Sequence, residues 1–144
     1  MKTFLFLAAL ALALSAHAAK RPRTSAFEEW RQVRTANIPR ELELIVGSET
    51  CFRKVRAELG DVALFERMAH LLKKHFRHYD RKTVDSALER MKELQPSVDP
   101  VRAATDYAHI RSRVELFMDK DPDKWRPVLE NLDATLKELQ QNYR

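Results

Sequence analysis

The sequence predicts an all-α protein, a single-domain helical bundle of about five helices. Apolar residues recur at helical spacing through most of the chain. Caps and prolines separate these segments. The one stretch that alternates like a strand, residues 40–46, has no second strand with which to pair. About 125 residues remain after the predicted signal, and this length is enough to bury one hydrophobic core.

The first 18 residues have the pattern of an export signal. Lys2 precedes an apolar run over residues 4–14, and Ala16-His17-Ala18 is a cleavage site of the small-x-small type. The apolar run is too short to span a bilayer, and no later segment qualifies as a transmembrane helix. We therefore expect residues 1–18 to be a signal peptide and residues 19–144 to be the exported domain.

The domain is expected to begin with short helices. Ser25 and Glu28 have the spacing of a capping box, so a helix should start there. Residues 40–46 alternate as in a strand, but Pro39 suits the first turn of a helix. Since a partner strand is missing from the sequence, helix is the preferred interpretation. Ser48 should then cap the next helix.

Residues 61–82 are the stretch around which we expect the other helices to pack. Gly60 should end the preceding helix with a left-handed cap, and Asp61 should cap the new one. The apolar side chains of this stretch fall within one arc of about 160°. They are Leu64, Phe65, Met68, Ala69, Leu71, Leu72, Phe76 and Tyr79. After Tyr79 the stripe changes phase by roughly 120°, which predicts a bend or break near residues 80–83.

Two further helices should complete the bundle. Pro96 ends the segment that follows the break, and Asp99 with Pro100 is an N-cap followed by a first-turn proline. A loop over residues 119–126 should lead to the last helix. The apolar stripe of that helix is Trp125, Val128, Leu129, Leu132, Leu136, Leu139 and Tyr143.

The composition argues against several classes of site. Cys51 is the single cysteine, so an internal disulfide is impossible. We interpret it as a small buried apolar residue, the alternative being an intermolecular disulfide in a homodimer. Two glycines are too few for a phosphate-binding loop or a dinucleotide fingerprint. No spacing of serine, histidine and aspartate supports a catalytic triad, so we expect neither an enzyme nor a cofactor.

Two weaker patterns are compatible with metal binding. His75 and His78 lie on neighbouring sides of one helix and could share a metal with a third ligand from elsewhere. His75 could also be the axial ligand of a non-covalent haem. We favour instead a hydrogen-bonded, partly buried His75 and a solvated His78.

The second pattern has the ligand spacing of an EF-hand calcium loop, and its residues are Asp119, Asp121, Asp123 and Glu130. Lys124 replaces the glycine that such a loop needs at its sharp turn. An acidic turn that favours the start of the last helix is therefore the preferred interpretation.

The face opposite the central apolar stripe is cationic. Residues 66–82 contain six basic and two acidic side chains, a net charge of +4. The basic side chains that we assign to partner binding are Arg67, Lys73, Lys74, Arg77 and Arg81, with His70 beside them. Such a face suits an acidic glycoprotein or another anionic surface, whereas nucleic acid is a poor candidate for an exported chain. The alternative is an ordinary solvated helix face.

Short patterns support a family resemblance. They are Leu44-Ile45-Val46-Gly47, Gly60, the pair Lys73-Lys74, and Lys124-Trp125-Arg126-Pro127-Val128-Leu129-Glu130. On these residues the chain resembles the sperm lysins of marine gastropods and their fusogenic acrosomal paralogue. The resemblance implies a five-helix bundle, secreted from the acrosome at fertilization, that binds an egg-envelope glycoprotein and opens the envelope without cleaving bonds. Its basic track would be Lys73, Lys74, Arg77 and Arg81.

A bacterial origin is the alternative interpretation. The signal is rich in alanine and leucine and ends in Ala16-His17-Ala18, a pattern equally suited to export into a periplasm. On that interpretation the bundle would be a periplasmic binding, chaperone or immunity protein. Both interpretations predict an interaction protein rather than an enzyme.

Overall fold

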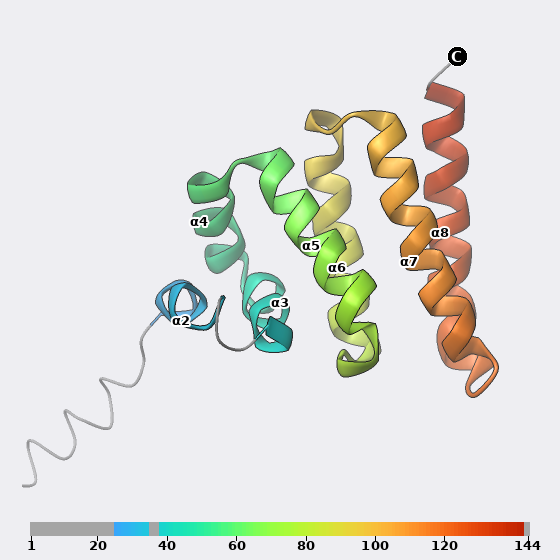
Figure 1. The fold of residues 1–144 in the computed structure, drawn as a ribbon, viewed down its shortest axis with the longest axis horizontal. Helices are drawn as coiled ribbons and strands as arrows, with labels where there is room; N and C mark the ends of the chain where they lie inside the picture. The colour runs from blue at the N-terminus through green and yellow to red at the C-terminus, as the bar shows by residue number, and fades with distance from the viewer. Residues whose placement is uncertain (1–24, 35–37, 143–144) are drawn as a thin grey trace, which may run out of the picture.

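The computed structural model describes residues 25–34 and 38–142, and within these ranges the regular structure is entirely helical (Figure 1). The α-helices are α2 (Ala26–Val33), α3 (Ile38–Gly47), α4 (Glu49–Leu59), α5 (Asp61–His75), α6 (Arg81–Leu94), α7 (Pro100–Met118) and α8 (Pro122–Asn142). The all-α prediction is confirmed. The expected count of about five is wrong, because seven α-helices lie in the described ranges. The predicted signal peptide lies outside the described residues.

Serine caps start two of the short helices, as the sequence predicted. The hydroxyl of Ser25 accepts a hydrogen bond from the backbone N–H of Glu28 at 3.3 Å. The hydroxyl of Ser48 accepts one from the backbone N–H of Cys51 at 3.0 Å. Each bond satisfies a donor that a helix leaves open at its first turn. The ambiguous residues 40–46 lie within α3, so the helical interpretation is confirmed.

The junction between α4 and α5 confirms one prediction and corrects another. Gly60 has a φ of +86°, and its N–H donates to the carbonyl of Arg56 at 2.8 Å. Asp61 does not cap α5. Its carboxylate oxygens instead lie 2.7 and 2.9 Å from the Nε and Nη2 atoms of Arg56, and one also accepts from the hydroxyl of Ser97. Two hydrogen bonds to a charged guanidinium are stronger than a single bond to a neutral backbone N–H. Asp61 therefore binds Arg56 instead of capping α5.

The predicted break in the central stretch falls slightly earlier than expected. α5 ends at His75, and a 3-10 turn over Phe76–His78 follows it. Asp80 then caps α6, because its Oδ1 accepts from the backbone N–H of Thr83 at 2.8 Å. The helix expected to continue to about residue 79 therefore ends at His75, and α6 begins at Arg81. The chain turns here because the apolar stripes on either side point in different directions.

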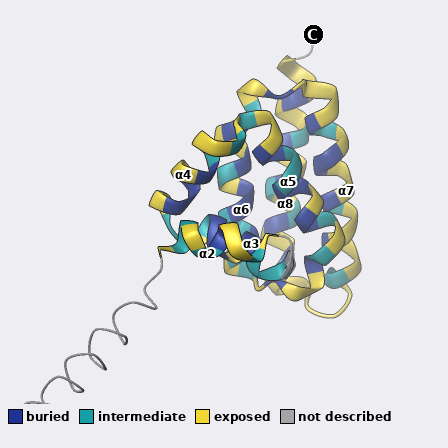
Figure 2. Ribbon diagram, turned by 60° about the vertical axis from the view of Figure 1, so that its left-hand side comes forward, coloured by how far each residue is buried: buried dark blue, intermediate teal, exposed yellow. Residues whose placement is uncertain are grey.

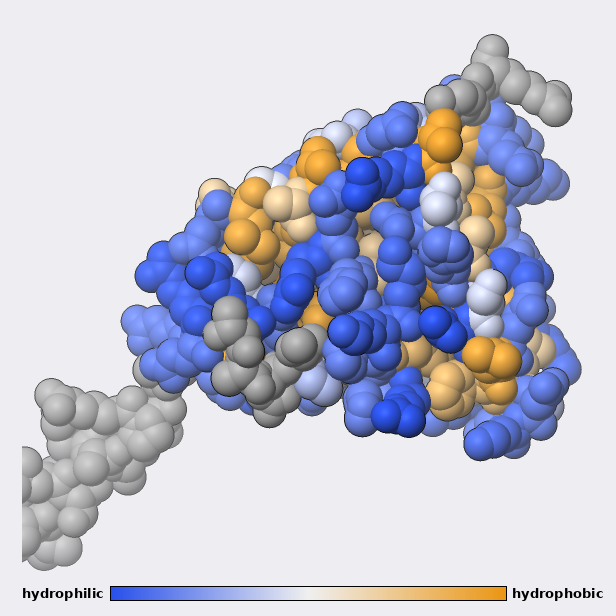
Figure 3. All heavy atoms as spheres, viewed as in Figure 1, coloured by the Kyte–Doolittle hydropathy of each residue, from blue (hydrophilic) through white to orange (hydrophobic). Residues whose placement is uncertain are grey.

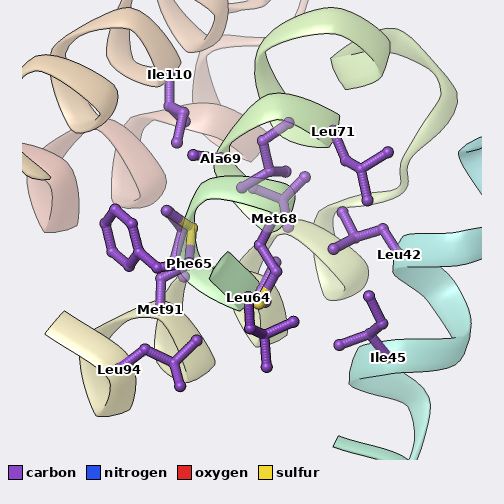
Figure 4. Close-up of a cluster of buried hydrophobic side chains, with 14 of the residues drawn as sticks. Leu42, Ile45, Leu64, Phe65, Met68, Ala69, Leu71, Met91, Leu94 and Ile110 are labelled. Carbon is purple, nitrogen blue, oxygen red and sulfur yellow. The ribbon is translucent and has the colours of Figure 1, made fainter. Parts of the chain in front are cut away.

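α5 lies at the centre of the bundle and packs against α3, α4, α6 and α7. All eight apolar residues predicted for this stretch are buried, and Figure 2 shows the buried residues on the inward faces of the helices. Figure 4 shows side chains from neighbouring helices around those of α5. They are Leu42 and Ile45 from α3, Met91 and Leu94 from α6, and Ile110 from α7. The outer face of α5 is thereby left to carry the charged side chains.

α7 and α8 form a hairpin at one side of the bundle (Figure 1). Asp99 is the N-cap residue of α7 and Pro100 is its first residue, as predicted. The loop expected over residues 119–126 is wrong, because α8 already begins at Pro122. Proline fits the first turn of a helix, so the connection shortens to residues 119–121. In the described ranges, no helix has the length and hydrophobicity of a membrane span.

Candidate functional site

The five cations predicted to form one binding face have different environments in the structure. Arg67 is held by Glu41, whose Oε1 lies 3.0 Å from Nε and 2.5 Å from Nη2 of the guanidinium. The side chain of Glu41 is only 1% exposed, and its Oε2 accepts from the indole N–H of Trp30 at 3.0 Å. A buried carboxylate needs such partners, so Arg67 has a structural role.

Two more of these cations are paired with carboxylates. The Nζ atom of Lys73 lies 2.8 Å from Oδ1 of Asp106, which is buried on α7. Arg81 forms an ion pair with Asp85 on the next turn of α6, with 3.2 Å between Nε and Oδ2. These pairs offset the positive charge of both side chains. Sequence reasoning did not identify Glu41 as the partner of Arg67 or Asp106 as the partner of Lys73.

Lys74 and Arg77 differ from the other three. Both are exposed, and no carboxylate in the described part of the chain pairs with either. They lie at the C-terminal end of α5 and in the turn after it, with the exposed His70 one turn earlier. The C-terminal end of a helix favours positive charge. We call His70, Lys74 and Arg77 the α5 patch, and Figure 3 shows hydrophilic side chains over much of the face on which α5 lies.

The structure brings His75 and His78 near each other, with 6.0 Å between ring centroids. Within the described ranges, however, no group of three histidine, cysteine, aspartate or glutamate side chains is placed to hold a metal ion. His75 is half-buried and His78 is exposed, as expected. The hydrogen bond expected for His75 is not formed, because its buried Nε2 has no partner among the described residues.

The environment of His75 makes stability depend on pH. Burial is the main cause that lowers the pKa of its imidazole, and nearby cations lower it further. These cations are Lys74, His78, His70 and Arg67. Since the unfolded chain then binds the proton more readily, the free energy of unfolding should fall as the pH drops below about 6.5.

We expect the variant His75→Gln to lose part of this pH dependence. The rest should remain because partial desolvation and the nearby cations also lower the pKa of His70. Urea denaturation at pH 5, 6 and 7 measures the slope. The variant His109→Gln, at an exposed position on α7, is the matched control. An unchanged slope in His75→Gln would contradict the assignment.

The four carboxylates with EF-hand spacing do not come together. Asp119 and Asp121 lie in the short connection before α8, whereas Asp123 and Glu130 belong to α8 itself. Oδ1 of Asp121 accepts from the backbone N–H of Lys124 at 3.3 Å, which supports the start of the helix. This bond supports the acidic-turn interpretation, and no group of three such side chains in the described ranges is placed to hold a metal ion.

Cys51 is buried and unpaired, which confirms its interpretation as a small apolar residue. Burial also raises the pKa of its thiol. An intermolecular disulfide would need an accessible sulfur atom, so this thiol does not support a linked homodimer.

Sequence reasoning did not find the hollows on the described surface, of which two bear on binding. One, of about 300 Å³, lies among α2, α3, α4 and α5 and includes Glu41 and Arg67 in its lining. The other is an apolar groove of about 760 Å³ between α7 and α8, where Val101 is 52% exposed. Ala104 and Ala108 are small residues four positions apart, so they lie on the same face of α7. This spacing could have predicted the groove.

No protein-family model, curated protein or solved structure matches this chain. The described residues form an all-α bundle in which tertiary ion pairs reduce the predicted cationic face to a smaller patch.

Proposed function

We propose that this is a secreted, non-enzymatic helical interaction protein that binds an acidic partner through the α5 patch. One observation carries the proposal. Lys74 and Arg77 are exposed without a carboxylate partner in the described chain, whereas Arg67 and Lys73 are bound to buried carboxylates. Among the described residues, Lys74 and Arg77 form no ion pair that stabilises the fold, so their positive charges are available to attract an anionic surface.

An acidic glycoprotein is the partner that we propose. The resemblance to sperm lysins supports an egg-envelope glycoprotein met after release from the acrosome. Recognition by exposed cations involves no bond cleavage, so the protein would act stoichiometrically. The interaction should weaken as salt rises, because the Debye length is only about 8 Å at physiological ionic strength.

The double variant Lys74→Ala/Arg77→Ala tests this proposal. We expect it to bind a heparin-coated or sialoglycoprotein-coated surface roughly tenfold more weakly at low salt, since each exposed ion pair contributes about 0.2–1 kcal/mol. Surface plasmon resonance at two salt concentrations measures the loss. Because both side chains are exposed, Tm should stay unchanged.

A second double variant, Lys54→Ala/Lys137→Ala, controls for net charge. It removes the same two positive charges from exposed positions on α4 and α8. Unweakened binding in this control, together with the loss in the first variant, would support the patch. Equal weakening in both would indicate a general charge effect, and binding unchanged in both would reduce the patch to solvated surface.

A further inference from the structure

The smaller hollow has the composition of a binding pocket. Four helices contribute to its lining, which is formed by Trp30, Arg34, Glu41, Leu59, Ala63 and Arg67. Its volume of about 300 Å³ is at the lower end of the range for small-molecule sites. A leucine and an alanine supply apolar walls, two arginines supply hydrogen-bond donors, and the indole of Trp30 is only 1% exposed. This combination suits a compact ligand with one apolar part and one polar end.

The guanidinium of Arg67 is held in a fixed orientation. Its Nε and Nη2 atoms donate to Oε1 of Glu41, and Nη2 also donates to the carbonyl of Arg34 at 3.2 Å. Glu41 is itself positioned by the indole N–H of Trp30. These bonds leave the two N–H groups of Nη1 without an acceptor among the described residues. A donor whose orientation is already set loses little entropy when it binds an anion.

The charges around the pocket leave one positive charge in excess. Arg31 and Arg34 share the carboxylate of Glu58, from which Nη1 of Arg34 lies 3.9 Å away. Glu41 offsets the charge of Arg67. Three positively charged guanidinium groups are therefore paired with only two carboxylates. A ligand with a single negative charge would neutralise the remaining positive charge.

We propose that this pocket binds a small monocarboxylate with an apolar part. The carboxylate would accept hydrogen bonds from Nη1 of Arg67 and from Arg34, and the apolar part would pack against Leu59 and Ala63. The proposal is independent of the α5 patch, which uses Lys74 and Arg77.

Benzoate is the probe for the first experiment. The full mature chain is titrated with benzoate, and with benzyl alcohol as the neutral ring of similar size, by isothermal titration calorimetry. The two tryptophans, Trp30 and Trp125, give separate indole N–H signals in a ¹H–¹⁵N spectrum. Benzoate should bind saturably and shift the Trp30 signal alone, and benzyl alcohol should bind at least about tenfold more weakly.

Two variants and one matched control locate the site. Arg34→Gln, at a side chain that is 44% exposed, should weaken benzoate binding about tenfold by removing a charged donor. Ala63→Leu fills the pocket from an exposed helical position and should abolish binding without lowering Tm. The control Arg53→Gln removes an exposed guanidinium that lies outside the lining and outside this charge balance, so it should retain binding.

The proposal is overturned if benzoate fails to bind saturably, if benzyl alcohol binds equally well, or if Ala63→Leu binds benzoate as the natural chain does. Lys74→Ala/Arg77→Ala should bind benzoate normally. Failure of this inference and failure of the proposed function are therefore distinguishable.

Discussion

Replacing Phe65 with alanine should lower the free energy of unfolding by about 3–5 kcal/mol. The side chain is fully buried on the inner face of α5. Its ring meets the ring of Tyr107 edge-on, with 5.6 Å between centroids. Helices on several sides hold the surrounding side chains in place, so the cavity left by the ring should collapse only in part. Urea denaturation followed by circular dichroism measures the loss.

Val62 provides the control on the same helix. It is 45% exposed, so Val62→Ala should change the free energy of unfolding by less than about 0.5 kcal/mol. Losses of similar size at Val62 and Phe65 would contradict the orientation of α5 in the bundle.

Replacing Glu41 with leucine should cost about 3 kcal/mol, again measured by urea denaturation. The change removes the acceptor of the Trp30 indole and leaves Arg67 without its buried partner. The side chain of Arg67 is 32% exposed and can turn toward water, which keeps the loss at the lower end of the range for broken buried pairs.

The double variant Glu41→Leu/Arg67→Met separates the ion pair from its individual charges. Apolar side chains of similar size can replace a buried pair at little cost, so the double variant should be more stable than Glu41→Leu alone. The single variant Arg67→Met completes the comparison. If the stability losses of Glu41→Leu and Arg67→Met simply add in the double variant, the carboxylate and the guanidinium do not interact as the structure indicates.

Local features of the fold could be predicted from the sequence. The buried stripe of residues 61–82 and the serine caps at Ser25 and Ser48 depend on side chains a few positions apart. One error arose because a side chain has a distant partner. Asp61 has a capping position by its sequence, yet it binds Arg56 and Ser97, and the second of these is 36 residues away. Helix periodicity cannot predict which of these partners the carboxylate of Asp61 binds.

The sequence by itself determined the helical class, most helix starts and the central role of residues 61–82, because hydrophobic periodicity and capping act over a few residues. The tertiary structure alone decided which cations remain accessible. Glu41 lies 26 residues from Arg67, and Asp106 lies 33 residues from Lys73. Ion pairs over such separations form only when helices pack, so the α5 patch and the pocket beside Arg67 could not be predicted from spacing along the chain.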